Sequence, residues 1–114
     1  MKTRLFYVFI AIFLFAGLSY AVQGLVKPEN VCMVNDRHLG VKQISVEVGG
    51  KVYYGCCKMC VSRIRNNESI RYAVDPVSKK KVNKASAFIL ALKDGRVLYF
   101  ENLENVEKFL KSKN

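Results

Sequence analysis

The sequence is poor in the side chains that polar catalytic sites use. Its 114 residues include one histidine, His38, and only 9 acidic residues against 19 basic ones. No nucleophile, general base and orienting acid come together in the sequence, so hydrolytic catalysis has no support. We therefore predict that the protein is not an enzyme.

The scarcity of acidic residues leaves a formal net charge of +10. In a cytosolic protein such a charge would point first to nucleic acid. After an export signal it fits an anionic membrane surface or an acidic partner protein better. The alternative is a solvated surface that keeps a small protein soluble, and the lysine run over residues 79–81 together with Lys84 is interpreted in this way. We predict no nucleic-acid partner.

The N-terminal segment has the pattern of an export signal. Two basic residues and no acid precede an apolar run over residues 5–18, and a small-residue pattern that a signal peptidase reads ends at Ala21. We predict that residues 1–21 are a signal peptide, and the alternative is an uncleaved membrane anchor, because the run has an intermediate length. The first cysteine after this run, Cys32, lies too far away for lipid attachment. The protein is then expected to be periplasmic or secreted, or anchored to the membrane by its N-terminus.

Residues 31–71 predict a β-hairpin followed by a helix. Apolar and polar residues alternate over 44–48, Gly49-Gly50 supplies a tight turn, and an apolar aromatic stretch returns. Apolar residues three positions apart then indicate a short helix over 58–66. Residues 22–30, which precede this unit, are expected to be a linker.

The second unit, residues 72–114, repeats this plan. A shift of 45 residues places residues 50–54 on residues 95–99 without a gap, which indicates an internal duplication. Asn102 can then cap a helix whose apolar residues form a single stripe. Each unit is too small to bury an apolar face alone, so we expect the two to pack into one small α+β domain.

Four cysteines mark the first unit. Cys32 precedes its hairpin, whereas Cys56, Cys57 and Cys60 follow the returning strand and enter the helix. A hairpin brings its ends together, and a helix N-terminus stabilises a thiolate through its free N–H groups and its macrodipole. Thiolates are the ligands that zinc and copper(I) need, so we predict a metal site at Cys32, Cys56 and Cys60, with Cys57 as a further ligand. The other candidates for the fourth ligand are His38, Met33 and Met59.

The identity of the ion and the state of the thiols stay open. Thioethers beside the thiols favour copper(I), and a zinc site with four cysteines is the alternative. Copper(I) also tolerates two- and three-coordinate thiolate sites, which would leave Cys57 spare for transfer. Disulfides are common in exported proteins, although adjacent Cys56 and Cys57 pair with difficulty, and the spacing from Cys57 to Cys60 also suits redox chemistry. Two other functions therefore remain: a structural or interaction module whose zinc or disulfide site stabilises the fold, and a thiol redox protein.

The cysteine spacing also resembles a known family. Cys32, Cys56 and Cys60 are similar to the three-cysteine pattern of TRASH-type metal-binding domains. The second unit resembles the related YHS domain, most clearly over residues 75–78 and 95–100, with Ser78, Glu101 and Asn105 standing where that domain has cysteines. The resemblance implies two treble-clef-like units that bind a heavy metal, copper or zinc. It also implies metal sensing, handling or trafficking, with an envelope metal-transport protein as a candidate partner.

Overall fold

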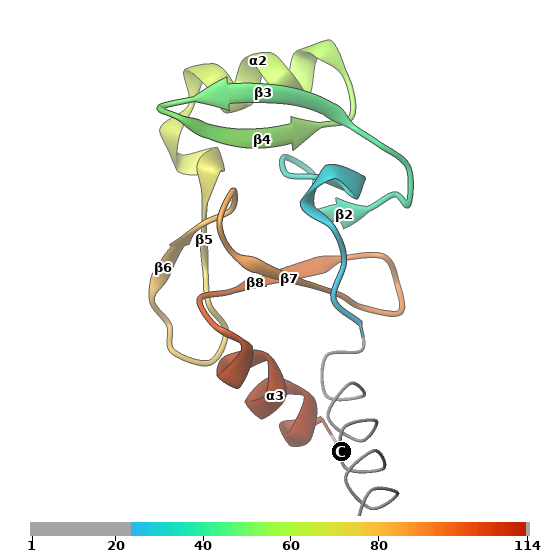
Figure 1. Ribbon diagram of the computed structural model, residues 1–114, viewed down its shortest axis with the longest axis vertical. Helices are drawn as coiled ribbons and strands as arrows, with labels where there is room; N and C mark the ends of the chain where they lie inside the picture. The colour runs from blue at the N-terminus through green and yellow to red at the C-terminus, as the bar shows by residue number, and fades with distance from the viewer. Residues whose placement is uncertain (1–23, 114) are drawn as a thin grey trace, which may run out of the picture.

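The computed structural model describes residues 24–113, whose elements form two successive sets (Figure 1). Each set has a short antiparallel hairpin, a longer antiparallel hairpin and a helix. The first set is β1 (Val31–Cys32), β2 (Arg37–His38), β3 (Ile44–Val48), β4 (Lys51–Gly55) and α2 (Lys58–Asn66). The second set is β5 (Tyr72–Val74), β6 (Lys81–Asn83), β7 (Phe88–Ala91), β8 (Val97–Phe100) and α3 (Leu103–Ser112). Short 3-10 turns, η2 (Pro28–Asn30) and η3 (Glu68–Arg71), precede the two sets. The predicted α+β fold of two hairpin–helix units is confirmed.

The longer hairpins and the helices keep the repeat in register. Gly49 and Gly50 turn the first hairpin with φ of 59° and 79°, and Gly95 turns the second with φ of 93°, in the left-handed region that glycine adopts without strain. The two helices then start from the same backbone geometry, with φ −155° and ψ 172° at the N-cap Cys57 and φ −153° and ψ 167° at the N-cap Asn102. Side chains at matching positions of the two helices can therefore be compared directly.

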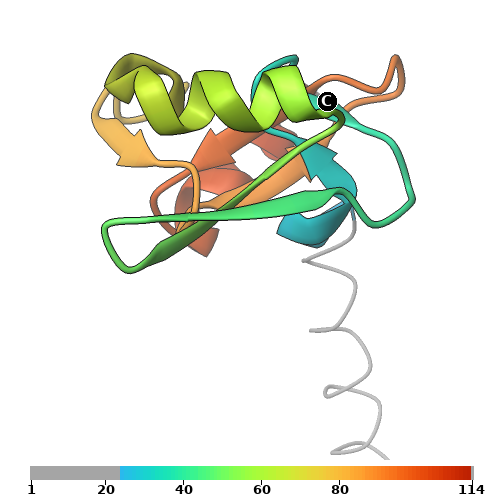
Figure 2. The same ribbon diagram turned by 90° about the horizontal axis from the view of Figure 1, so that it is seen from above.

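The two units share one hydrophobic core. In Figure 1 the hairpin and helix of the first unit lie at one end, α3 lies at the other, and β2, β7 and β8 lie between them; Figure 2 shows α2 beside β3 and β4. The buried residues of the core cluster come from both units: Val31, Met33, Val46, Tyr53, Ile64, Val82, Ile89, Val97 and Tyr99. A smaller cluster under α3 contains Leu90, Phe100 and Val106. Because the larger cluster draws on both sets, neither unit covers its apolar face alone.

The described part of the predicted linker belongs to the fold. Leu25 forms an antiparallel bridge with Leu90, the Val26 N–H donates to the Ile89 carbonyl at 3.0 Å, and the Ala91 N–H donates to the Gly24 carbonyl at 3.0 Å. The described start of the predicted linker therefore pairs with the edge of β7. The physical reason is the edge of β7, whose backbone groups would otherwise be left without partners.

The predicted signal peptide, residues 1–21, lies outside the described residues. Within residues 24–113, neither helix has the length and apolar character needed to cross a membrane.

Candidate metal centre

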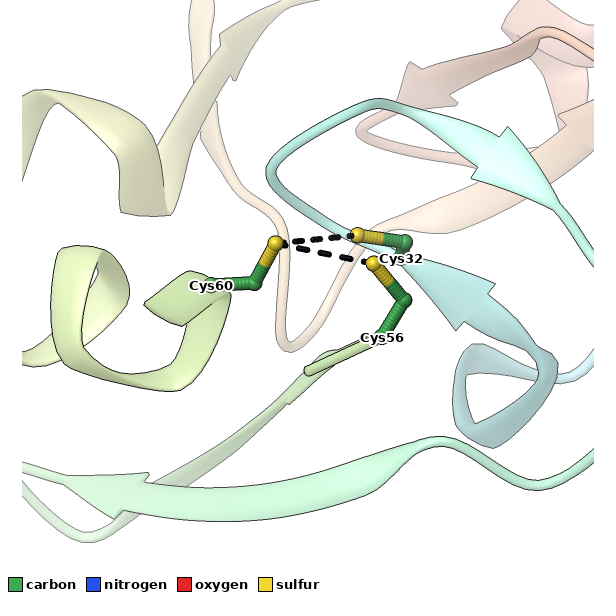
Figure 3. Close-up of side chains that lie close together, drawn as sticks. All are labelled: Cys32, Cys56 and Cys60. Carbon is green, nitrogen blue, oxygen red and sulfur yellow. Dashed lines mark hydrogen bonds between the residues drawn. The ribbon is translucent and has the colours of Figure 1, made fainter. Parts of the chain in front are cut away.

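Three elements of the first unit bring three thiols together. Cys32 is the last residue of β1, Cys56 directly follows β4, and Cys60 lies in the first turn of α2. Their side chains point toward one another (Figure 3). Cys60 Sγ lies 4.0 Å from Cys32 Sγ and 3.6 Å from Cys56 Sγ, and all three sulfurs lie within 4.8 Å of one another. The predicted residues Cys32, Cys56 and Cys60 thus form a possible metal-binding site.

The sulfur separations suit a single ion. A zinc–sulfur bond of about 2.3 Å places two ligand sulfurs about 3.8 Å apart in a tetrahedral site and about 4.0 Å apart in a trigonal one. The observed Sγ distances from Cys60, 3.6 Å to Cys56 and 4.0 Å to Cys32, bracket these values. An ion of this size could therefore bind between the thiols with small movements of the sulfurs.

Backbone N–H groups prepare the buried Cys32 for ionisation. Burial opposes the thiolate, but N–H groups of Asn35, Val34 and Cys56 donate to this sulfur, and together they lower the pKa of Cys32. Two of these donors come from the turn between β1 and β2, and the third comes from the end of β4. The same backbone that places the sulfur therefore stabilises its charge.

The environment of Cys60, in contrast, opposes the ionisation of its thiol. Burial and the hydrogen bonds to Cys56 and Cys57 raise the pKa of its thiol to about 12. For Cys56, the hydrogen bond with Cys60 favours the thiolate, but the hydrogen bond with Cys32, burial and the neighbouring charges outweigh it and raise the pKa. An ion that enters this cluster must therefore displace protons, as metal binding by thiols does in general.

Cys57 lies at the edge of the cluster. It is exposed at the N-cap of α2, and its Sγ lies 3.6 Å from Cys60 Sγ. The free N–H of Cys60 at the start of the helix lowers the pKa of the Cys57 thiol. The three-thiol group, as found among the described residues, does not include Cys57. Cys57, which the sequence predicts as a further ligand, thus lies beside the three-thiol group and contacts its member Cys60.

The other candidates for the fourth ligand lie in three different settings. Met33 is fully buried in the hydrophobic core, where its thioether packs against apolar side chains. Met59 is 71% exposed on the first turn of α2. His38 lies in β2 opposite Val31, and among the described residues it is not part of the three-thiol group. Met33 is therefore part of the hydrophobic core.

Sequence reasoning missed a group of residues that hold the turn carrying Cys32. Lys84 is only 5% exposed, and its Nζ donates to the Met33 carbonyl at 2.7 Å and to Asp36 Oδ1 at 2.9 Å. The Tyr99 hydroxyl donates to the same carboxylate oxygen at 2.9 Å. The interpretation of Lys84 as a solvated surface charge is therefore wrong. Its position beside the lysine run carries no signal of burial, because the partners lie in the other unit.

Side-chain and backbone contacts complete the support of this turn. Asn35 Nδ2 lies 3.7 Å from Cys56 Sγ and donates to it. The Val97 N–H donates to the Asp36 carbonyl at 3.0 Å, and the His38 N–H donates to the Gly95 carbonyl at 2.8 Å. The second unit therefore fixes the loop from which the first unit presents Cys32.

The second unit contains a matching cluster without thiols. Asp75 is fully buried, and its Oδ1 accepts from the N–H groups of Val77 at 2.7 Å and Ser78 at 3.1 Å. Its Oδ2 accepts from the Glu101 N–H and from Asn105 Nδ2, each at 2.9 Å. These donors outweigh the effect of burial and lower the pKa of the Asp75 carboxyl. A hydrogen-bonded carboxylate thus joins the short hairpin to the helix.

The donor pattern identifies Asp75 as the counterpart of Cys32. Each accepts from the N–H groups two and three residues further on and from the residue after the longer hairpin. The Ser78 position, which the resemblance gives to a YHS cysteine, is therefore not the counterpart of Cys32 within this chain. Ser78 matches Asn35 instead, because its hydroxyl donates to Glu101 Oε2 at 2.5 Å as Asn35 donates to Cys56. Cys32 and Asp75 are 43 residues apart, whereas the longer hairpins are 45 residues apart. The difference arises because the second unit has two more residues between its short hairpin and the end of its longer hairpin.

No family model, curated protein or solved structure matches this chain. The resemblance to TRASH and YHS domains therefore stays a prediction. The structure itself supports a small α+β domain with a three-cysteine group that could bind a metal ion.

Proposed function

We propose that the protein binds a soft metal ion, copper(I) or zinc, and handles it outside the cytosol. Cys32, Cys56 and Cys60 would hold the ion. The observation that carries this proposal is the convergence of three thiols from three separate elements, with Sγ separations of 3.6 and 4.0 Å about Cys60 that suit one shared ion. The protein would then be a binding protein and not an enzyme.

The exposure of the cluster supports handling over a purely structural role. Cys32 and Cys60 are buried, whereas Cys56 is exposed. Structural zinc sites normally close around the ion with four protein ligands, whereas an exchangeable site keeps an accessible position. The second unit also builds the same hairpin–helix junction from Asp75 and Asn105 without any sulfur. The arrangement of hairpins and helix therefore does not need a metal to form. This supports ion binding in the first unit as a function and not as a requirement of the fold.

Sequence features supply the cellular context of the proposal. The signal-like residues 1–21 support export to the periplasm or secretion, or membrane anchoring if they are retained. The resemblance to TRASH and YHS domains supports metal sensing, handling or trafficking. The net charge of +10 supports an acidic partner, such as an envelope metal-transport protein with an acidic surface.

The proposal is tested on protein purified without oxygen. Free thiols are counted, bound metal is measured, and copper(I) and zinc affinities are determined by competition with a chromophoric chelator. We expect one ion per chain in wild type, loss of tight binding in Cys60→Ser, and wild-type binding in the exposed helix control Ser62→Ala. A protein that contains two disulfides and binds neither ion would overturn the proposal.

A second candidate, thiol redox chemistry, has one supporting observation. Cys57 is exposed with a lowered pKa, and its Sγ lies 3.6 Å from that of Cys60, whose pKa is raised. An accessible thiolate beside a protonated thiol can form and release a disulfide with a substrate. Equilibration of the metal-free protein in glutathione redox buffers would test this candidate: a reversible Cys57–Cys60 disulfide in wild type that is lost in Cys57→Ser would support it.

A further inference from the structure

The two helix N-caps differ in what their side chains do. In the second unit, Asn102 Oδ1 accepts from the Asn105 N–H at 2.8 Å and so caps α3 in the ordinary way. In the first unit, Cys57 occupies the same backbone conformation, but its sulfur is a weak acceptor that makes no capping hydrogen bond of ordinary geometry within the described chain, although the nearby Cys60 N–H favours its thiolate. Its sulfur lies 3.6 Å from Cys60 Sγ instead. A thiol therefore stands where the matching unit has a helix-stabilising residue.

The four sulfurs are arranged from the surface inward. Cys57 and Cys56 are exposed, Cys60 is buried with 7% of its surface exposed, and Cys32 is fully buried. Cys60 lies at the centre, with its Sγ 3.6 Å from both exposed sulfurs and 4.0 Å from Cys32 Sγ. An ion bound to Cys60 can therefore reach either Cys57 on the solvent side or Cys32 on the inner side without leaving the cluster.

We propose that Cys57 is the transfer ligand of the site: it takes the ion from a thiolate donor and returns it to a thiolate acceptor. This inference rests on the proposed function and assigns different roles in ion binding to the four thiols. Cys32, Cys56 and Cys60 are the resident ligands. Cys57 binds the ion only while it enters or leaves, through a mixed complex with the donor or acceptor.

Each step exchanges copper–sulfur bonds and transfers no electrons. The donor holds copper(I) through thiolates, as glutathione does. Cys57 forms a new copper–sulfur bond as one donor copper–sulfur bond breaks, and the proton of the incoming thiol passes to the departing thiolate. Cys60 then replaces the second donor sulfur in the same way. Cys32 and Cys56 then form two copper–sulfur bonds as the bond to Cys57 breaks. One of their two protons passes to the departing Cys57 thiolate and the other to water, and copper becomes three-coordinate and stays in the +1 state.

The experiment separates resident binding from transfer in the full protein. Copper(I) stoichiometry and affinity are first measured by chelator competition for wild type, Cys57→Ser and Cys56→Ser. Stopped-flow absorbance then measures two rates: the transfer of copper(I) from copper(I)–glutathione to the protein, and its transfer from the protein to the chelator. The variant Cys57→Asn is added because it restores the capping residue of the second unit. We expect it to melt at a higher temperature than wild type, which keeps the test independent of misfolding.

We expect Cys57→Ser and Cys57→Asn to bind one copper(I) with near wild-type affinity and to transfer it about tenfold more slowly in both directions. Cys56→Ser should lose tight binding. Wild-type transfer rates in both Cys57 variants would overturn the inference, and so would a loss of affinity as large as that in Cys56→Ser, which would make Cys57 a resident ligand. Absence of copper(I) and zinc binding in wild type itself would instead overturn the proposed function.

Discussion

Asn105 stands in α3 where Cys60 stands in α2, and its Nδ2 donates to Asp75 Oδ2 at 2.9 Å, just as Cys60 meets Cys32 in the first unit. Both residues are 7% exposed and lie three positions after the N-cap. The two units therefore use different chemistry for one task, which is to join the short hairpin to the start of the helix. The carboxylate of Asp75 is satisfied by its own four donors, whereas the thiols are connected by weak contacts that an ion could replace with strong bonds.

The first prediction concerns the stability of the second unit. Asp75→Asn replaces the buried acceptor carboxylate with an amide that cannot accept from all four donors, so we expect a loss of about 3 kcal/mol in the free energy of unfolding. Urea denaturation at neutral pH measures this loss. The exposed Glu104→Gln on α3 is the control and should cost less than about 0.5 kcal/mol. An effect of Asp75→Asn no larger than that of the control would contradict the role of the carboxylate.

The same carboxylate predicts how stability depends on pH. Backbone and side-chain donors lower the pKa of Asp75 in the folded state despite its burial. A lowered folded-state pKa contributes stability that is fully present above the ordinary carboxyl pKa and is lost as pH falls through the folded-state value. Wild type should therefore lose stability more steeply below about pH 4 than Asp75→Asn does. Urea midpoints across the acid range measure the two slopes, and parallel slopes would contradict the prediction.

The second prediction concerns the tie between the units. Lys84→Met keeps an unbranched side chain that is one atom shorter but removes the hydrogen bonds to the Met33 carbonyl and to Asp36. We expect a loss of about 2 kcal/mol in stability and, because the turn that carries Cys32 loses its support, a roughly tenfold weaker metal affinity. The exposed Lys80→Met is the matched control for charge. Equal affinities in the two variants would show that Lys84 supports only the fold.

The third prediction tests the correspondence of the two units. Replacing Asp75, Glu101 and Asn105 together with cysteine should create a second three-thiol site and raise the copper(I) stoichiometry from one ion to two. The control changes Ser78, Glu101 and Asn105 to cysteine, the set that the sequence resemblance selects. It should not gain a second tight site, because Ser78 matches Asn35 and not Cys32. A second ion in the control alone would reverse the assignment.

The fourth prediction separates metal handling from a structural metal. Binding of an ion to the folded state should raise wild-type stability by about 2.7 kcal/mol when free metal exceeds its Kd a hundredfold. Because the second unit folds its frame without sulfur, removal of the ion by a chelator should leave the circular dichroism spectrum folded. Cys32→Ser should lose the metal-dependent gain. Unfolding of wild type on chelation would favour the structural alternative.

Local patterns in the sequence were sufficient for the secondary structure. Alternation over residues 44–48, the glycine turns and the capping residue Asn102 predicted the longer hairpins and both helices, and the structure confirms them. These signals are readable because strand alternation, positive φ and capping depend on residues close together in the chain. The short hairpins, β1–β2 and β5–β6, carry too few residues to show such a pattern.

Contacts between distant segments could not be predicted in the same way. Lys84 is bonded to groups in the other unit, and residues 24–26 pair with β7, although neither segment has a local pattern that indicates it. The 45-residue shift of the longer hairpins also does not extend to the short hairpins, where Cys32 matches Asp75. A buried charge requires partners that only the assembled chain supplies.

The sequence by itself determined that thiols would gather where a hairpin ends and a helix begins, because chain geometry forces Cys56, Cys57 and Cys60 into that junction. Only the tertiary structure decided which of the four thiols are buried and which contact one another. It brought Cys32 to Cys60 at 4.0 Å, left Cys57 in solvent, and gave the matching place in the second unit to Asp75. The physical reason is that the spacing of cysteines depends on the local backbone, whereas their burial and their donors depend on how the two units pack.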